Sequence, residues 1–187
     1  HRSASVEEFN AKYPELDNRR SMCLLMSETD LEIKPFQRLI KSVNKIEKEI
    51  LLNALRVNFE VTKVDKPLYD PKKHGEFGLY LKNEWYKLAT RNPRGRMDIV
   101  VLEEDIVKEV FGIQDSRTDS QISFHPHTEG LTTLVNLVDS ETFDVAITNK
   151  PCTFKEVRKI SDLGNVMPAK STFIEPKLRA GLIIQEF

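Results

Sequence analysis

The stretch DVAITNKPCTFKEVRKISDLG, residues 144–164, sets the expectation for the fold. Its first seven residues are rich in apolar and β-branched side chains and predict a buried strand. Thr153 and Glu156 then match a capping box, in which each side chain binds a backbone N–H of the other residue. Apolar residues follow at the helical period, and Gly164 stands where a helix can end. The stretch therefore predicts a strand followed by a helix.

The same alternation of strand and helix signals extends over the rest of the chain. We predict helices over residues 2–12, 46–58, 97–111 and 128–138. We predict strands over residues 21–28, 36–40, 59–64, 79–90, 122–127 and 180–187, with a hairpin turn in the fourth at Lys82-Asn83. Because the connections include hairpins and short crossovers, the expected fold is α+β, with helices packed on a mixed, largely antiparallel sheet.

Three local predictions depend on single residues. Pro35 interrupts the strand pattern before residues 36–40. Because proline cannot donate a hydrogen bond within a sheet, we predict an edge strand there. Thr128 is suited to cap the helix that follows it. In the helix over 46–58, one face is expected to be buried. The residues of that face are Ile46, Ile50, Leu51, Ala54 and Leu55.

Length and charge limit the class of protein. The 187 residues suit one domain, with a sub-boundary expected near residues 92–97, and the chain begins at His1. We therefore expect residues 1–187 to form a single region of a fragment or a processed form. The net charge is −1, which disfavours nucleic acids and anionic membranes as partners. No apolar run reaches the about 18 residues that span a bilayer.

The two cysteines, Cys23 and Cys152, lie far apart in the sequence. They are best interpreted as buried free thiols rather than as a disulfide or a metal-binding pair. A chain with reduced cysteines and without a signal peptide at its start is expected in the cytoplasm.

The segment NVMPAKSTFIEPKL, residues 165–178, resembles a phosphate-binding P-loop without fulfilling its requirements. A P-loop follows a strand, whereas Gly164 follows a predicted helix. Pro168 lacks an N–H that a phosphate cradle would use, and Ala169 replaces the glycine before Lys170. We therefore predict that this segment is not a P-loop.

The segment is nevertheless rich in groups that bind anions. Lys170 can pair with a phosphate or a carboxylate, and hydroxyl groups beside it can add hydrogen bonds. The polar side chains concerned are Lys170, Ser171, Thr172, Glu175 and Lys177. The alternative interpretation is a solvated loop that carries a Lys/Glu pair.

Several motifs resemble domain-of-unknown-function family 1015, a family of uncharacterised bacterial and archaeal proteins. The most specific is MPAKSTFIEPKLRAGL, residues 167–182, which is similar to the C-terminal signature of the family. The segments EEDIVKEVFGIQDSRTDSQISF, YLKNEWYKL and LEIKPFQRLIK resemble further parts of it. In the last of these, the family often has Thr-His where this chain has Phe36-Gln37.

The resemblance implies a role in phosphate chemistry. Family members carry an Asp-Gly-His-His-Arg motif, of which His1 and Arg2 would be the last two residues. The resemblance thus implies that residues 1–187 are a single C-terminal region of a longer protein. That motif is similar to one in ParB/sulfiredoxin-like domains, and the related free-serine kinases transfer phosphate to serine. With Arg38, Lys170 and Lys177, these residues would contact a nucleotide or a small phosphorylated ligand, with ATP or ADP and Mg²⁺ as cofactors.

A metal centre is a weaker hypothesis. His125 and His127 lie two residues apart, so that both would face one side of an extended segment, with Glu129 as a third ligand. The other interpretation is two loop histidines near the start of a helix. We predict no metal site.

The sequence leaves enzymatic activity and oligomeric state open. The leading hypothesis is a nucleotide- or phosphate-binding region with serine-kinase-like phosphotransfer in the longer protein. The alternative is a non-catalytic structural or protein-interaction domain.

Overall fold

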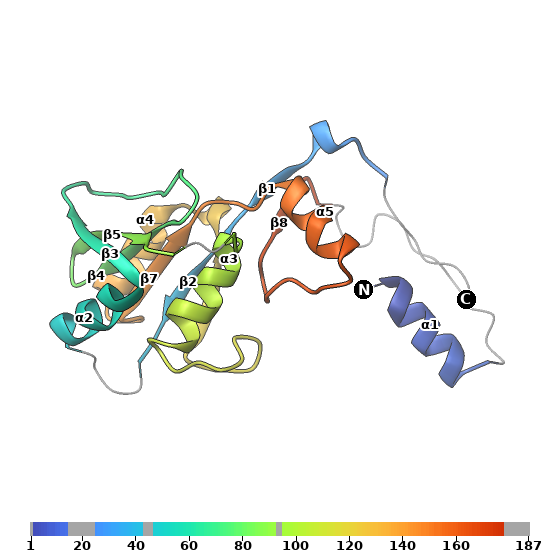
Figure 1. The fold of residues 1–187 in the computed structure, drawn as a ribbon, viewed down its shortest axis with the longest axis horizontal. Helices are drawn as coiled ribbons and strands as arrows, with labels where there is room; N and C mark the ends of the chain where they lie inside the picture. Colours follow the sequence, from blue (N-terminus) through green and yellow to red (C-terminus); the bar gives the residue numbers. More distant parts are fainter. Residues whose placement is uncertain (1, 15–24, 43–46, 93–94, 178–187) are drawn as a thin grey trace. The chain divides into compact units, whose positions relative to one another are not determined.

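The computed structural model describes residues 2–14, 25–42, 47–92 and 95–177, with side chains from residue 7 onward (Figure 1). The chain divides into two compact units. One contains residues 1–32 and 176–187, and the other contains residues 33–175. That the chain is one region with a sub-boundary near residues 92–97 stays a prediction.

In the first unit, helix α1 (Arg2–Lys12) has the bounds that the sequence predicts. The strand predicted over residues 21–28 is wrong in its described part. Leu25 to Ser27 form no strand, and Glu28 begins the short 3-10 helix η1 (Glu28–Asp30). The Ser27 hydroxyl accepts the Thr29 N–H at 3.3 Å and so caps this helix, which explains why the chain turns here.

The second unit contains a six-stranded sheet with the strand order β3-β5-β4-β7-β2-β6, in which all neighbours are antiparallel. Its strands are β2 (Phe36–Ile40), β3 (Phe59–Val64), β4 (Glu76–Leu81), β5 (Glu84–Thr90), β6 (Ile122–Pro126) and β7 (Val145–Asn149). Strands β1 (Glu32–Lys34) and β8 (Phe173–Glu175) form a separate two-stranded sheet. The antiparallel α+β fold predicted from the sequence is thus confirmed.

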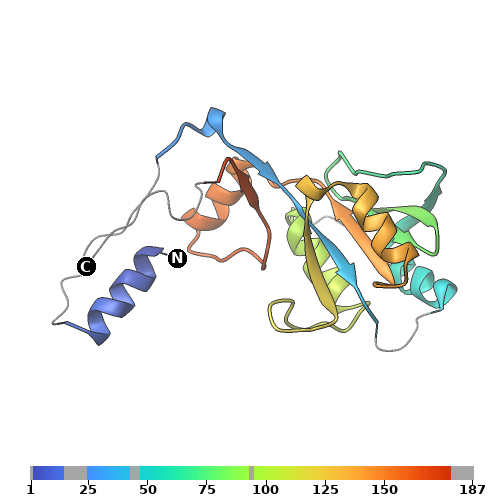
Figure 2. The same ribbon diagram turned by 180° about the vertical axis from the view of Figure 1, so that it is seen from behind.

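Helices cover both faces of the large sheet (Figures 1 and 2). Side chains alternate between the faces, so that Leu79 packs in the larger core and Tyr80 in the smaller one. The larger core lies under α2 (Lys48–Asn58), α3 (Asp98–Val101) and the π-helix η2 (Leu102–Lys108), and the smaller core lies under α4 (Leu131–Asp139). The other helices of this unit are the 3-10 helix η3 (His127–Glu129) and α5 (Phe154–Asp162).

The hairpin prediction is confirmed. Strands β4 and β5 are joined by Lys82 and Asn83, whose φ angles are 48° and 64°. Two consecutive residues with positive φ are typical of the tight turns that match the twist of a hairpin. The prediction of an edge strand over Phe36–Ile40 is wrong, because β2 lies between β7 and β6. Pro35 immediately precedes the strand and so removes no hydrogen bond from its interior.

Two helix predictions also need correction. In α2, the buried residues are Leu51, Leu52 and Leu55, whereas Ile50 is 61% exposed and Ala54 is exposed. Ile46 lies outside the described residues. Helix α4 begins after Gly130, and Thr128 lies within η3 instead of capping it.

The helix predicted over residues 97–111 forms, and Gly112 follows it with a φ of 73°. Its second part is a π-helix, which sequence patterns do not reveal. The last predicted strand, over residues 180–187, lies outside the described residues. Within the described ranges, the chain contains no helix with the length and hydrophobicity that crossing a membrane requires.

Candidate functional site

The loop between α5 and β8 carries the motif MPAKST, residues 167–172. It is closed by the Ser171 hydroxyl, which donates to the Pro168 carbonyl at 2.5 Å. The Cys152 thiol donates to the Ser171 carbonyl at 3.8 Å. Cys152 is buried and free, as predicted, and burial raises the pKa of its thiol to about 11, so that it remains a protonated donor. Cys23 lies outside the described residues. The loop therefore has a fixed backbone path.

Arg38 holds the same loop from β2. Its side chain is fully buried, and its guanidinium donates to the Phe36 carbonyl at 2.6 Å and to the Ala169 carbonyl at 3.2 Å. Burial lowers the pKa of Arg38 to about 10, although the negative charge of Glu103 opposes this change. The guanidinium remains charged at neutral pH. Arg38 thus binds the loop backbone instead of facing a ligand directly.

Lys170 is the exposed basic residue of this loop. Its backbone has a φ of 50°, in the left-handed region that residues other than glycine rarely adopt. Its ammonium nitrogen lies 5.4 Å from the centre of the Phe36 ring. Phe36 in turn packs edge-to-face against Phe173, with ring centres 5.3 Å apart. The loop and strand β2 thus set the position of this charge.

The structure brings together only part of the predicted contact set. Arg38, Lys170 and Ser171 meet at the loop, with Thr172 beside it in the chain. Glu175, in β8, forms an ion pair of 2.5 Å with Lys34 of the adjacent strand β1. His1 and the side chain of Arg2 lie outside the described residues. Lys177 is exposed and belongs to the other unit.

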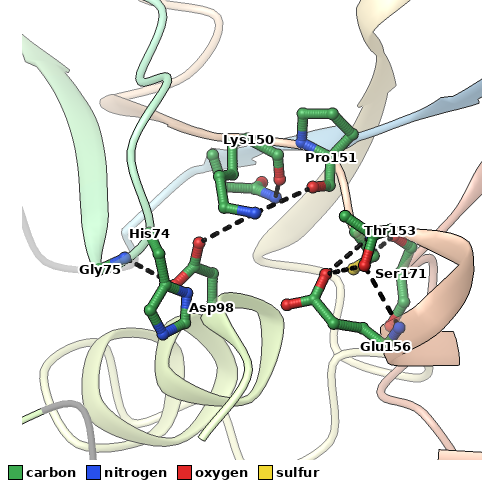
Figure 3. A network of polar contacts seen from close by, with 10 residues as sticks. His74, Gly75, Asp98, Lys150, Pro151, Thr153, Glu156 and Ser171 are labelled. Atoms are coloured by element: carbon green, nitrogen blue, oxygen red, sulfur yellow. Dashed lines mark hydrogen bonds and ion pairs between the residues drawn. The ribbon is translucent and has the colours of Figure 1, made fainter. Parts of the chain in front are cut away.

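A network of polar side chains lies at the end of β7 (Figure 3). Asp98, at the start of α3, is buried, and its Oδ1 atom accepts the Gly75 N–H at 2.8 Å. The Nδ1 atom of His74 lies 2.7 Å from the same oxygen, and the Lys150 ammonium lies 3.8 Å from Oδ2. Burial raises the pKa of Asp98, while the Gly75 N–H and the charges of His74 and Lys150 oppose this rise.

The network continues into the N-terminus of α5. The Thr153 N–H donates to the Glu156 carboxylate at 2.7 Å, and the Glu156 N–H donates to the Thr153 hydroxyl at 3.2 Å. The predicted capping box is thus confirmed. Partial burial acts to raise the pKa of Glu156, but the hydrogen bonds from Thr153 and the charges of Lys150 and His74 together lower it.

We expect Thr153→Ala to lower the free energy of unfolding by about 1 kcal/mol, because it leaves the Glu156 N–H, in the first helical turn, without its acceptor. Urea unfolding followed by circular dichroism measures this loss. Thr153→Ser keeps the hydroxyl and serves as the control, with stability near that of the wild type. Equal stability of the alanine variant and the wild type would contradict the prediction.

His125 and His127 do not form a pair around a common ligand. The Nδ1 atom of His125 lies 3.3 Å from the Glu129 carboxylate, whereas that of His127 lies 3.0 Å from the Gln37 amide nitrogen. Across the residues that the structure describes, no group of three or more His, Cys, Asp or Glu side chains is arranged to hold a metal ion.

Sequence reasoning missed His74, Asp98 and Lys150 as a group. They come from the loop before β4, the start of α3 and the end of β7, and they are separated by 24 and 52 residues in the sequence. The one signal available was the basic segment YDPKKHG, in which a histidine follows two lysines. Only the sheet topology brings the three segments together.

Comparison with known proteins identifies the family. The model of the family described as "Protein of unknown function (DUF1015)" matches residues 1–117. The chain belongs to this family, as its motifs suggest. A search of curated proteins finds no match.

Solved structures with a similar fold include a free serine kinase in complex with AMP, at a TM-score of 0.50 and 14% identity over 90% of this chain and 65% of that one. A conserved hypothetical protein from Pyrococcus furiosus has a TM-score of 0.49 and 16% identity over 78% and 56%. SbnI from Staphylococcus aureus has a TM-score of 0.48 and 15% identity over 80% and 52%. The chain thus spans between about half and two-thirds of these structures. At such identities the similarity concerns the fold alone.

Proposed function

We propose that this chain forms part of a nucleotide- or phosphate-binding site, and that the full-length protein transfers phosphate to a small hydroxyl acceptor in the manner of a serine kinase. The observation that carries the proposal is the conformation of Lys170. A lysine with positive φ costs about 1 kcal/mol or more, because its Cβ crowds the backbone. Such strain persists where the surrounding structure enforces it, and this is common in ligand-binding loops.

The contacts of the loop are arranged to present a charge. Arg38 and the Cys152 thiol occupy the carbonyls of Ala169 and Ser171, and the Ser171 hydroxyl occupies that of Pro168. The Lys170 side chain is exposed, and its ammonium group lies over the Phe36 ring. A fixed ammonium group of this kind suits a phosphate, which it binds as a point charge.

The fold adds support. The free serine kinase with a TM-score of 0.50 was solved with AMP bound. ATP or ADP with Mg²⁺ are therefore the ligands to test first, together with serine as acceptor. The proposal includes a cytoplasmic location and a ParB-like phosphate-facing motif that ends in His1 and Arg2. It includes no nucleic-acid partner, because the net charge is −1. It concerns the full-length protein.

The alternative function is a non-catalytic structural or protein-interaction domain. In that case the loop only stabilises the fold, and Lys170 contributes only through the contact of its ammonium group with the Phe36 ring. The two functions predict different results for the same substitution.

We expect Lys170→Ala in the full-length protein to weaken ADP and ATP binding by roughly ten-fold or more, because a charge-assisted contact is lost. Its free energy of unfolding should change by less than about 1 kcal/mol, because the side chain is exposed. Isothermal titration calorimetry and urea unfolding measure the two quantities.

Two further variants make the test of Lys170 sharper. Lys170→Gly also removes the charge but adopts positive φ without strain, so it should remain as stable as the wild type and still lose binding. Lys155→Ala removes an exposed lysine of α5 and should change neither quantity. The proposal fails if wild-type protein binds none of the nucleotides, or if Lys170→Ala binds them as the wild type does.

A further inference from the structure

His74 is paired with a buried carboxylate at the surface of the second unit. The Nδ1 atom of His74 lies 2.7 Å from Oδ1 of Asp98, and the exposed fractions of the two side chains are 48% and 6%. The same Asp98 oxygen accepts the Gly75 N–H, which fixes the carboxylate relative to the loop that carries the histidine. Figure 3 shows these three residues side by side at the start of α3.

This contact determines the chemical state of the imidazole. The negative charge of Asp98, 2.7 Å from Nδ1 of His74, favours a proton on this nitrogen over one on Nε2. In the neutral ring, the proton on Nδ1 leaves a lone pair on Nε2. A carboxylate that holds the tautomer and orientation of an imidazole also stabilises the positive charge that the ring acquires when Nε2 bonds to another atom.

Lysine and carboxylate side chains lie near the pair of His74 and Asp98. Lys150 lies 3.8 Å from the other oxygen of Asp98, and Lys72 and Lys73 directly precede His74 in the chain and are exposed. Asp70 pairs with Lys72, and the Glu156 carboxylate accepts hydrogen bonds from Thr153. The exposed ammonium group of Lys73, next to His74 in the chain, can therefore offset part of the charge of an anion on the histidine.

We propose that His74 is a phosphate-accepting residue that carries a phosphoryl group on Nε2. In the reaction with a small donor such as phosphoramidate, the Nε2 lone pair forms a bond to phosphorus while the P–N bond of the donor breaks. The amino group, already protonated in the donor, leaves as ammonia with the bonding electron pair. The Nδ1 proton stays in place beside the Asp98 carboxylate, whose negative charge balances the positive charge of the phosphorylated ring.

As a step in phosphotransfer, this inference rests on the proposed function, because a nucleotide would then be the natural donor and a hydroxyl compound the final acceptor. The modification itself depends only on His74 and its surroundings. A small donor without a nucleoside therefore tests it separately from nucleotide binding by the Lys170 loop.

The test incubates the full-length protein with phosphoramidate. Phosphohistidine is then detected by ³¹P nuclear magnetic resonance and located by peptide mass spectrometry at alkaline pH. We expect an acid-labile phosphate on His74 that is absent in His74→Gln. Asp98→Asn should slow its formation by roughly ten-fold or more, because the orienting charge is lost. His127→Gln removes another partly exposed histidine and serves as the matched control, with labelling at the wild-type rate.

Absence of phosphate on His74, or labelling of His127 at the same rate, would overturn the inference, as would equal rates in a folded Asp98→Asn variant and the wild type. If Asp98→Asn does not fold, the comparison of wild type, His74→Gln and His127→Gln still decides the outcome. Phosphorylation of His74 in a protein that binds no nucleotide would uphold this site and refute the proposed function alone.

Discussion

Replacing Arg38 with methionine is expected to lower the free energy of unfolding by about 3 kcal/mol. Methionine has a similar length but no donors, so the carbonyls of Phe36 and Ala169 lose their hydrogen bonds inside the protein. The buried Glu103 carboxylate also loses the long-range attraction of the Arg38 charge. Removing one of two interacting buried charges costs more stability than removing both, because the remaining charge is left without compensation.

A double-mutant cycle separates these contributions. In the Arg38→Met background, Glu103→Gln should recover part of the lost stability, because it removes the uncompensated charge. In the wild-type background, the same change should be destabilising, because Glu103 accepts the Ser116 hydroxyl and balances Arg38. Urea unfolding of the four proteins measures the coupling. Arg38→Met with stability within about 1 kcal/mol of the wild type would contradict the role of Arg38 as the anchor of the loop. Where the variant is folded, it should also have lost its response to nucleotides.

Features decided by neighbouring residues could be predicted from the sequence. The capping box involves Thr153 and Glu156, three residues apart, and the hairpin turn involves Lys82 and Asn83. In both, the interacting groups are so close in the chain that distant contacts do not change the outcome. The bounds of α1 follow for the same reason, because Pro14 limits the helix.

Features that depend on contacts between residues far apart in the chain could not be predicted from the sequence. The buried face of α2 includes Leu52 instead of Ile50, because which of several adjacent apolar residues is buried depends on how the helix sits on the sheet. The sequence predicts an edge strand for β2 because Pro35 precedes it, whereas the strand lies inside the sheet, where its polar residues are Gln37 and Arg38. Both are buried, and their partners include Asn149 and Ala169, more than a hundred residues away in the chain.

The candidate sites show the same division. The sequence singled out Lys170 and Ser171 by residue type, but the positive φ of Lys170 and its support by Arg38 follow only from the three-dimensional structure. No sequence motif marks the pair of His74 and Asp98, because a histidine in a loop and an aspartate at the start of a helix are both common in proteins. Their chemistry arises from a contact that the topology of the sheet creates.

Gly78→Ala is expected to be the most disruptive single-methyl substitution in the second unit, with a loss of about 3 kcal/mol from overpacking and a broken hydrogen bond. A Cβ atom at this position would lie 2.3 Å from the Thr148 hydroxyl oxygen, 3.0 Å from Tyr69 and 3.2 Å from Trp85. The Thr148 hydroxyl donates to the Tyr69 carbonyl, and the Trp85 ring N–H donates to the Pro67 carbonyl. Both carbonyls belong to the loop that carries His74, so displacing these side chains also releases the loop.

A second cycle identifies the steric cause. Thr148→Ala removes the oxygen that the new methyl group would strike, so Gly78→Ala/Thr148→Ala should be more stable than Gly78→Ala by about 1 kcal/mol, although Thr148→Ala alone is destabilising. Gly112→Ala is the matched control. It has a φ of 73° and no neighbour within 4 Å of the added atom, so its cost of about 1 kcal/mol arises from the backbone and should not depend on Thr148. If Thr148→Ala fails to rescue Gly78→Ala, steric conflict at the centre of the sheet is not the cause. If it does rescue, the packing beneath the His74 loop sets the position of that histidine, and the rate at which phosphoramidate labels His74 should recover together with the stability.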